Sequence, residues 1–239
     1  MEPPLILAIR TGDSEKVGTV LNEVNVNEAN ADGNTPLLIA CALGNSVIVN
    51  MLIKKGPNLN AITSTGFTPL MIATVNQFKE IVEILCAAGA SVNATTNKDT
   101  GLTALMLASG RYSSDNVPAN PQIVETLIHN GADVNIQATK GYTALMDASI
   151  ANNPEIVEML LQNGADPSLK TEDNQTAYSL IYNPNGHNPA WIEMIRPPAG
   201  GSRGRRKTRR SRQSRQSRQS GGRRTRYRKH RSRQTRRRG

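Results

Sequence analysis

Histidine and cysteine are the side chains best suited to catalysis or metal binding, and the chain holds few of either. The three histidines, at positions 129, 187 and 230, are far apart, and none lies near a cysteine or carboxylate at metal-ligand spacing. Cys41 and Cys86 fall in apolar stretches, where buried free thiols are common, and they are too few for a disulfide framework. The sequence also lacks a phosphate-binding Walker loop and a His-Glu-x-x-His pair. We therefore expect no enzyme activity, no bound metal and no cofactor.

Arginine supplies the other recognisable chemistry, and it is concentrated at the end of the sequence. Residues 200–239 hold 19 Lys and Arg and no Asp or Glu, which leaves 10 basic residues against all 19 acidic ones in the preceding part. Guanidinium groups bind phosphate in a bidentate manner, and Tyr227 is the one aromatic residue there that could stack on a base. Because this segment has no apolar periodicity to offset the entropy of ordering, we expect residues 199–239 to form a disordered tail.

Several functions fit the tail, and the sequence leaves them open. It could be a nuclear or nucleolar targeting signal, a phosphate-dependent contact to RNA or DNA, a segment that folds back on the acidic part, or a solubilising tail without a ligand. In composition it resembles the Arg-rich ends of proteins from large DNA viruses. The residues that would carry targeting or nucleic-acid contact are Arg205, Arg206, Lys207, Arg209, Arg210, Arg223, Arg224, Arg236, Arg237 and Arg238.

The first 198 residues contain a repeated unit that could position a binding surface. Five segments have a Thr two residues after a Gly or Asn, and these threonines are spaced by 33, 35, 40 and 33 residues. Pro or Ala and then an apolar run follow each Thr. In four units the motif Ile-Val-x-x-Leu comes next, and then a closing Gly-x-x-x-Asn or Gly-x-x-x-Ser. The three motifs are marked by Thr35, Thr68, Thr103, Thr143 and Thr176, by Ile48, Ile81, Ile123 and Ile156, and by Gly56, Gly89, Gly131 and Gly164.

Each unit is predicted to form two short helices. The Thr can cap the first helix, and Pro suits the first turn. That helix should end near Gly44, Gln77 or Asn152, at a position where Gly or Asn tolerates a left-handed backbone. The second helix carries Ile-Val-x-x-Leu on its inner face and stops at the closing Gly. Because neither helix can bury its apolar stripe alone, neighbouring units must stack on one another.

This pattern resembles the ankyrin repeat, whose signature is Thr-Pro-Leu-His-x-Ala with a Gly-Ala-Asp-Val-Asn close, over about residues 3–196. The resemblance implies an all-α solenoid of about six helix-turn-helix units with projecting hairpin loops and a concave face. The units would lie at about residues 1–31, 32–64, 65–97, 98–137, 138–170 and 171–198, giving a repeat domain of residues 1–198 and a tail of residues 199–239. It also implies a non-enzymatic scaffold for an unidentified protein partner, and we expect the repeat domain to be a monomer.

The His of the family motif is missing from every unit. Its place is taken by Ile6, Leu38, Met71, Met106, Met146 and Ser179. Methionine adapts to irregular gaps in a core, so we interpret the three Met as core residues and expect these units to depend more on apolar packing.

Candidate partner-binding residues lie at the hairpin tips and at the ends of the first helices. Phe67, Leu102 and Tyr142 follow the turn Gly and would form an apolar strip, although packing between hairpins is the alternative. Asp147 replaces an apolar residue and could anchor a cation of the partner or be satisfied locally. Residues 110–121 include seven extra residues, which are either a binding loop or a tolerated insertion. The set is completed by Val75, Asn76, Arg111, Tyr112 and Ile150.

Two hypotheses for the function remain. The first is a protein-binding module that binds a partner on its concave face and hairpin tips and uses the tail as an address or a nucleic-acid contact. The second is a non-specific nucleic-acid-binding protein in which the tail works and the repeats are a spacer or an assembly contact. The sequence shows no signal peptide and no membrane span, so we expect an intracellular protein, nuclear or nucleolar if the tail is an address and otherwise cytoplasmic.

Overall fold

The computed structural model describes residues 2–97, 99–110, 119–184 and 188–197. Met1–Ala199 form one compact unit, called the repeat domain from here on, and Gly200–Gly239 lie outside the described residues. The basic residues predicted for targeting or nucleic-acid contact therefore lie outside the described residues, and so do Arg111 and Tyr112.

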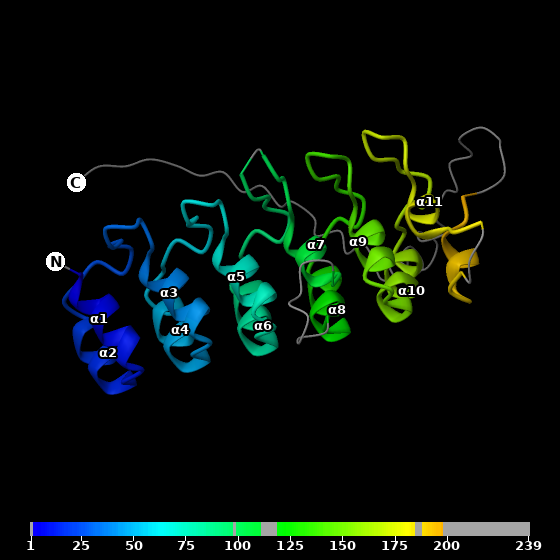
Figure 1. The fold of residues 1–239 in the computed structure, drawn as a ribbon. Helices are drawn as coiled ribbons and strands as arrows, with labels where there is room; N and C mark the ends of the chain where they lie inside the picture. Colours follow the sequence, from blue (N-terminus) through cyan, green and yellow to red (C-terminus); the bar gives the residue numbers. More distant parts are fainter. Residues whose placement is uncertain (1, 98, 111–118, 185–187, 198–239) are drawn as a thin grey trace, which may run out of the picture. The chain divides into compact units, whose positions relative to one another are not determined.

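Helices arranged in pairs make up the repeat domain, as the sequence repeat predicts. Figure 1 shows the pairs side by side, with the first helix of each pair nearer the hairpin loops. The described residues contain no strand, only an isolated bridge between Thr95 and Thr103. The all-α ankyrin-type solenoid is thus confirmed. The pairs are α1 (Pro4–Thr11) and α2 (Ser14–Val20), α3 (Pro36–Leu43) and α4 (Ser46–Ile53), α5 (Pro69–Val75) and α6 (Lys79–Ala87), α7 (Ala104–Ala108) and α8 (Pro121–His129), and α9 (Ala144–Ile150) and α10 (Pro154–Gln162).

The sixth unit differs from the others in its second half. Its first helix, α11, spans Ala177–Ile181, and a short 3-10 turn, η1, spans Ile192–Ile195 in place of a second α-helix. The Nε1–H of Trp191 donates to Oδ1 of Asn152 at 3.2 Å and so ties this turn to the preceding unit.

Threonine begins the first helix in every unit after the first. Its Oγ1 accepts a hydrogen bond from the backbone N–H three residues later, at 3.2–3.4 Å, which satisfies one of the unpaired donors of the helix N-terminus. The predicted capping is therefore confirmed at Thr35, Thr68, Thr103, Thr143 and Thr176.

Left-handed residues end these helices where the sequence predicts them. Gly44 has φ 73°, and two residues with side chains, Gln77 and Asn152, adopt φ 60° and 53° at the equivalent turn. A left-handed backbone is rare for residues other than Gly, Asn and Asp, so Gln77 is the unusual member. The turn it forms is nevertheless the same, because the Phe78 N–H donates to the Ala73 carbonyl at 2.9 Å just as the Asn153 N–H donates to the Ala148 carbonyl at 3.0 Å.

An apolar core runs along the stack and is built mainly from Leu, Ile, Val, Ala and Met. The second motif supplies residues with no exposed surface, such as Ile48, Ile123 and Ile156. Met71, Met106 and Met146 are each about 1% exposed, which confirms that they fill the core.

Asparagine side chains link consecutive units at the point where each unit closes. The Oδ1 atoms of Asn27, Asn60, Asn93 and Asn135 accept hydrogen bonds at 2.7–2.9 Å from a backbone N–H of the next unit. Asn93 and Asn135 also donate from Nδ2 to a backbone carbonyl of the next unit, at 3.0 and 2.9 Å. Sequence reasoning missed this ladder, although an Asn recurring at one place in the unit was a signal for it.

Candidate functional site

The cysteines have no reactive character in this fold. Cys41 is fully buried and Cys86 is 8% exposed. Burial raises the pKa of Cys41 to about 12 and that of Cys86 to about 11, because the thiolate would lose its hydration. Both thiols therefore stay protonated and act as small apolar residues of the core.

Metal-binding clusters and membrane spans were sought among the described residues. No group of three or more His, Cys, Asp or Glu in that part of the chain could hold a metal ion. None of the helices that the structure describes is long and apolar enough to cross a membrane. His129 is exposed at the end of α8, whereas positions 187 and 230 lie outside the described residues.

Charge is distributed unevenly between the first and second helices. The first helices α3, α5, α7 and α11 contain no Asp, Glu, Lys or Arg. In contrast, the second helices α6, α8 and α10 carry five glutamates against one Lys. The two rows of helices therefore offer different chemistry to a partner.

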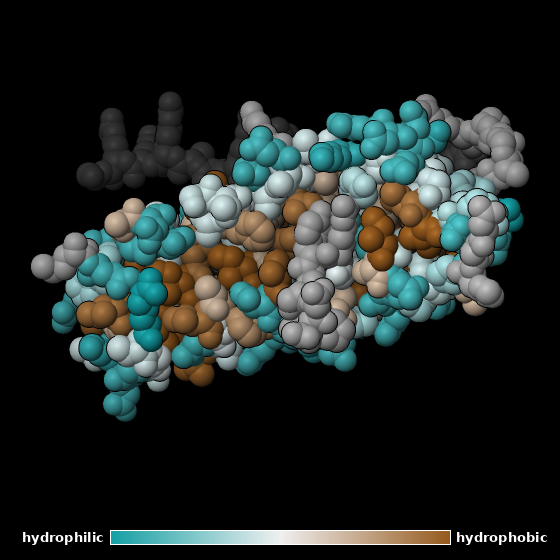
Figure 2. All heavy atoms as spheres, in the orientation of Figure 1, coloured by the Kyte–Doolittle hydropathy of each residue, from teal (hydrophilic) through white to brown (hydrophobic). Residues whose placement is uncertain are grey.

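The first helices expose aliphatic side chains at their ends. Leu43 ends α3 and is 51% exposed, and Ile150 ends α9 and is 40% exposed. Val75 ends α5 and is half-buried, with the exposed Asn76 next to it. Leu7 on α1 is 52% exposed. Figure 2 shows apolar surface over the part of the repeat domain that holds α1 to α6 and again near α9, below the more polar hairpins.

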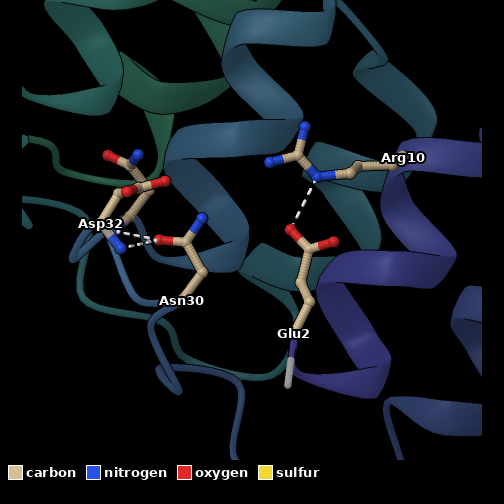
Figure 3. Close-up of polar contacts among 5 residues, drawn as sticks. Glu2, Arg10, Asn30 and Asp32 are labelled. Atoms are coloured by element: carbon tan, nitrogen blue, oxygen red, sulfur yellow. Dashed lines mark hydrogen bonds and ion pairs between the residues drawn. The ribbon is translucent and has the colours of Figure 1, made fainter.

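The charge at the N-terminal end of this layer is compensated within the chain. Arg10 of α1 donates from Nε to Oε1 of Glu2 at 2.8 Å (Figure 3). In the neighbouring hairpin, Asn30 turns its side chain back and accepts from the N–H groups of Asp32 and Asn34 at 3.1 and 2.9 Å. Such an Asx turn fixes the hairpin, and the ion pair offsets the charge of Arg10, which is the charged residue of α1.

The residues after the turn glycines do not form the exposed strip that the sequence predicts. Leu102 is only 8% exposed, and two hydrogen bonds to Thr96 hold it, so that its side chain enters the core between units. Phe67 and Tyr142 are half-buried and pack against the same core. The difference arises because the later hairpins contact one another: the Thr139 N–H donates to the Thr100 carbonyl and the Glu172 N–H to the Lys140 carbonyl, both at 3.1 Å.

Asp147 lies in α9 with no exposed surface. A carboxylate in this position is shielded from solvent and from a docking partner. We therefore leave Asp147 and Leu102 out of the proposed binding surface. That either residue contributes to binding stays a prediction from the sequence.

A groove separates the outer sides of α8 and α10. It has a volume of about 440 Å³, and its lining includes Glu125, Ile128, Glu155, Glu158 and Met159. Asn120 and Asn153 cap the two helices with their side chains, and a Pro at the first helical position sets the direction of each. The sequence indicated the helices but not the groove, because the groove depends on how two units stack.

Family profiles match most of the repeat domain. "Ankyrin repeats (3 copies)" matches residues 5–96, "Ankyrin repeat" residues 100–139 and "Ankyrin repeats (many copies)" residues 127–181. The chain belongs to the ankyrin-repeat family. Ankyrin repeats generally mediate protein–protein interaction, and proteins of this family are generally non-enzymatic scaffolds.

Two known proteins illustrate the range of the family. The mouse "Ankyrin repeat and SAM domain-containing protein 6" is 26% identical over 144 residues, which are 59% of this chain but only 12% of that protein. A chain in the solved structure of "Bd0816 Predatory Endopeptidase from Bdellovibrio bacteriovorus in complex with immunity protein Bd3460" is 31% identical, with a TM-score of 0.64. That match covers 73% of this ankyrin-repeat chain and 88% of the other.

Proposed function

We propose that this ankyrin-repeat protein is a non-enzymatic module that holds a protein partner against its first helices. The observation that carries the proposal is the row of first helices, which bears little charge and in which Leu43, Val75 and Ile150 end α3, α5 and α9 with exposed or half-exposed aliphatic side chains. Apolar surface of this kind gains free energy when a partner removes it from water. Asn76, beside Val75, adds an exposed amide to the same surface.

The hairpins provide the second border of the proposed surface. Phe67 and Tyr142 are half-buried and directly precede the Thr that caps a first helix, so part of each residue is exposed next to the first helices. Aromatic residues that are already held in place lose little entropy on binding, which makes them suitable anchors. Arg111 and Tyr112 lie outside the described residues and remain candidates from the sequence alone.

The basic tail supports a second role for the protein in addition to protein binding. Residues 200–239 carry 19 Lys and Arg and no acidic residue, which suits phosphate contact with RNA or DNA, or a nuclear or nucleolar address. We propose the tail as a targeting or nucleic-acid segment, and its likeness to viral tails stays a prediction. In the alternative function, the tail is the working element of the protein and the repeats serve as a spacer or assembly contact.

The proposed surface can be tested with a double substitution, Leu43→Ser with Ile150→Ser. Both side chains are exposed in the free protein, so the fold should lose little stability. If the surface binds a partner, protein captured from nuclease-treated cell extract should fall about tenfold, because hot-spot truncations cost on the order of 1 kcal/mol or more each.

Val47→Ser is the matched control. Val47 is 58% exposed, but it lies at the start of the second helix α4 rather than at the end of a first helix. This substitution should leave capture unchanged. Equal loss in both proteins, or no loss in the double variant, would contradict the proposed surface.

A further inference from the structure

The outer groove between α8 and α10 has a chemical character that the first helices lack. Glu125 and Glu158 are the third residues of the two Ile-Val-Glu segments, so they occupy the same place in successive units, and Glu155 lies one turn before Glu158. α8 and α10 contain no Lys or Arg, and His129 is the only basic residue in the lining. The groove is therefore acidic on both sides.

The carboxylates around the groove are largely unpartnered within the part of the chain that the structure describes. The carboxylates of Glu125 and Glu155 make no hydrogen bond or ion pair with described residues, and the carboxylate of Glu158 accepts only from Gln162 Nε2, at 3.0 Å. By contrast, the equivalent residue of the preceding unit, Glu83, is paired with Lys79 at 2.9 Å. The carboxylate at this position is thus paired with a Lys in one unit and has no cationic partner among the described residues in the next two.

An apolar floor distinguishes the groove from an ordinary acidic surface. Ile128 and Met159 line it and are half-buried, because they also pack against the core of the stack. A Lys or Arg side chain places an aliphatic stem below a charged head group, and such a stem can lie on apolar surface while the head group reaches a carboxylate. Methionine adapts its shape to the contact.

The spacing of the carboxylates selects the form of the ligand. Helices that pack side by side are about 8–10 Å apart, which sets the separation between equivalent residues of α8 and α10. In a polyproline II segment, residues i and i+3 lie on the same face and are about 9 Å apart, since the rise is about 3.1 Å per residue. A single metal ion would need the carboxylates to converge, and no such group exists among the described residues.

We infer that the α8–α10 groove is a second docking site, which binds an extended segment of a protein partner with Lys or Arg at every third position. One basic side chain pairs with Glu125 and the next with Glu158, while their stems cover Ile128 and Met159. The site lies on second helices, so it goes beyond the proposed function of the first helices. Electrostatic complementarity speeds the encounter of such a pair and sets the register.

A synthetic peptide tests this site without knowledge of the natural partner. The probe is a fluorescent peptide of three Ser-Arg-Gln units, which has an Arg at every third position. It is titrated against the chain ending at Ala199, because Met1–Ala199 form a compact unit with its own core. We expect saturable binding, and a peptide of the same composition with its three Arg adjacent should bind more weakly.

Two double variants that remove the same charge distinguish specific binding at the groove from general electrostatic attraction of the peptide. Glu125→Gln with Glu158→Gln should weaken probe binding about tenfold, since two partly exposed ion pairs are lost. The control, Glu15→Gln with Glu23→Gln, removes the same charge from the first unit and should change binding by less than about twofold. Circular dichroism melting of each variant checks that the fold is intact.

Each outcome decides the proposal. Equal weakening in the two double variants would mean diffuse attraction and would overturn it, as would absent binding or equal affinity for the two peptides. Leu43→Ser with Ile150→Ser should leave probe binding unchanged, so failure of the groove and failure of the first-helix surface can be told apart.

Discussion

Single residues in this protein owe their properties to their depth in the stack. Cys41 is the clearest case: burial raises the pKa of its thiol from about 9 to about 12. Below about pH 9 both the folded and the unfolded chain keep the proton, so the full stability is present. As the pH rises above that value, the unfolded chain releases the proton first, and stability is lost until the folded thiol also titrates.

The free energy of unfolding should therefore fall more steeply with pH in the natural protein than in Cys41→Ala. The difference should be up to about 1.4 kcal/mol per pH unit between about pH 9 and pH 11. Urea unfolding at several pH values measures it, with Lys and Tyr titration common to both proteins. Identical pH slopes would contradict the burial of this thiol.

Asn93 offers a second test at the scale of a residue. Its side chain accepts from the Asp133 N–H at 2.8 Å and donates to the Gly131 carbonyl at 3.0 Å, which joins two units. Asn93→Ala should lower the free energy of unfolding by about 1–2 kcal/mol, because two hydrogen bonds are lost near the surface. Asn50→Ala, at an exposed place in α4, should be neutral or slightly stabilising, and an equal loss there would contradict the ladder.

The hairpins are the elements whose stacking the structure defines most sharply. Gly33 and Gly66 form the same turn with φ 78° and 85°, but only Gly66 lies against the next hairpin. An added Cβ at Gly66 would lie 2.4 Å from the backbone N of Asn97, whereas nothing lies within 4 Å of one at Gly33.

Gly33→Ala should cost about 1 kcal/mol, the price of a left-handed Ala, and Gly66→Ala should cost at least about 2 kcal/mol more. Thermal unfolding of the two variants compares them directly. Similar losses would show that the hairpins are not packed against one another as described.

Elements that depend on local sequence could be predicted, and those that depend on stacking could not. The Thr caps and the turns at Gly44, Gln77 and Asn152 follow from a few adjacent residues, and the structure confirms them. The burial of Leu102 depends on the neighbouring hairpin, and the groove between α8 and α10 depends on the packing of two units. No pattern within one unit carries that information.

Across the whole repeat domain, local stability should decrease toward the last ankyrin repeat. α11 buries only Ala177, whereas α3 buries six residues, and each unit contacts mainly its neighbours. Trp191 is the single Trp of the chain, and its ring is half-buried in the last unit. In a urea titration, Trp fluorescence should therefore change at a lower concentration than helical circular dichroism, and coincident transitions would indicate a fully cooperative stack.

For the molecule as a whole, we expect the repeat domain, rather than the tail, to be the part that recognises a protein partner. Affinity capture from nuclease-treated cells, with the full chain and with the chain ending at Ala199, tests it most directly. We expect both chains to retain the same specific proteins and the Leu43→Ser, Ile150→Ser variant to lose them. Recovery that requires the tail and disappears with nuclease would contradict the account and favour a nucleic-acid-binding protein.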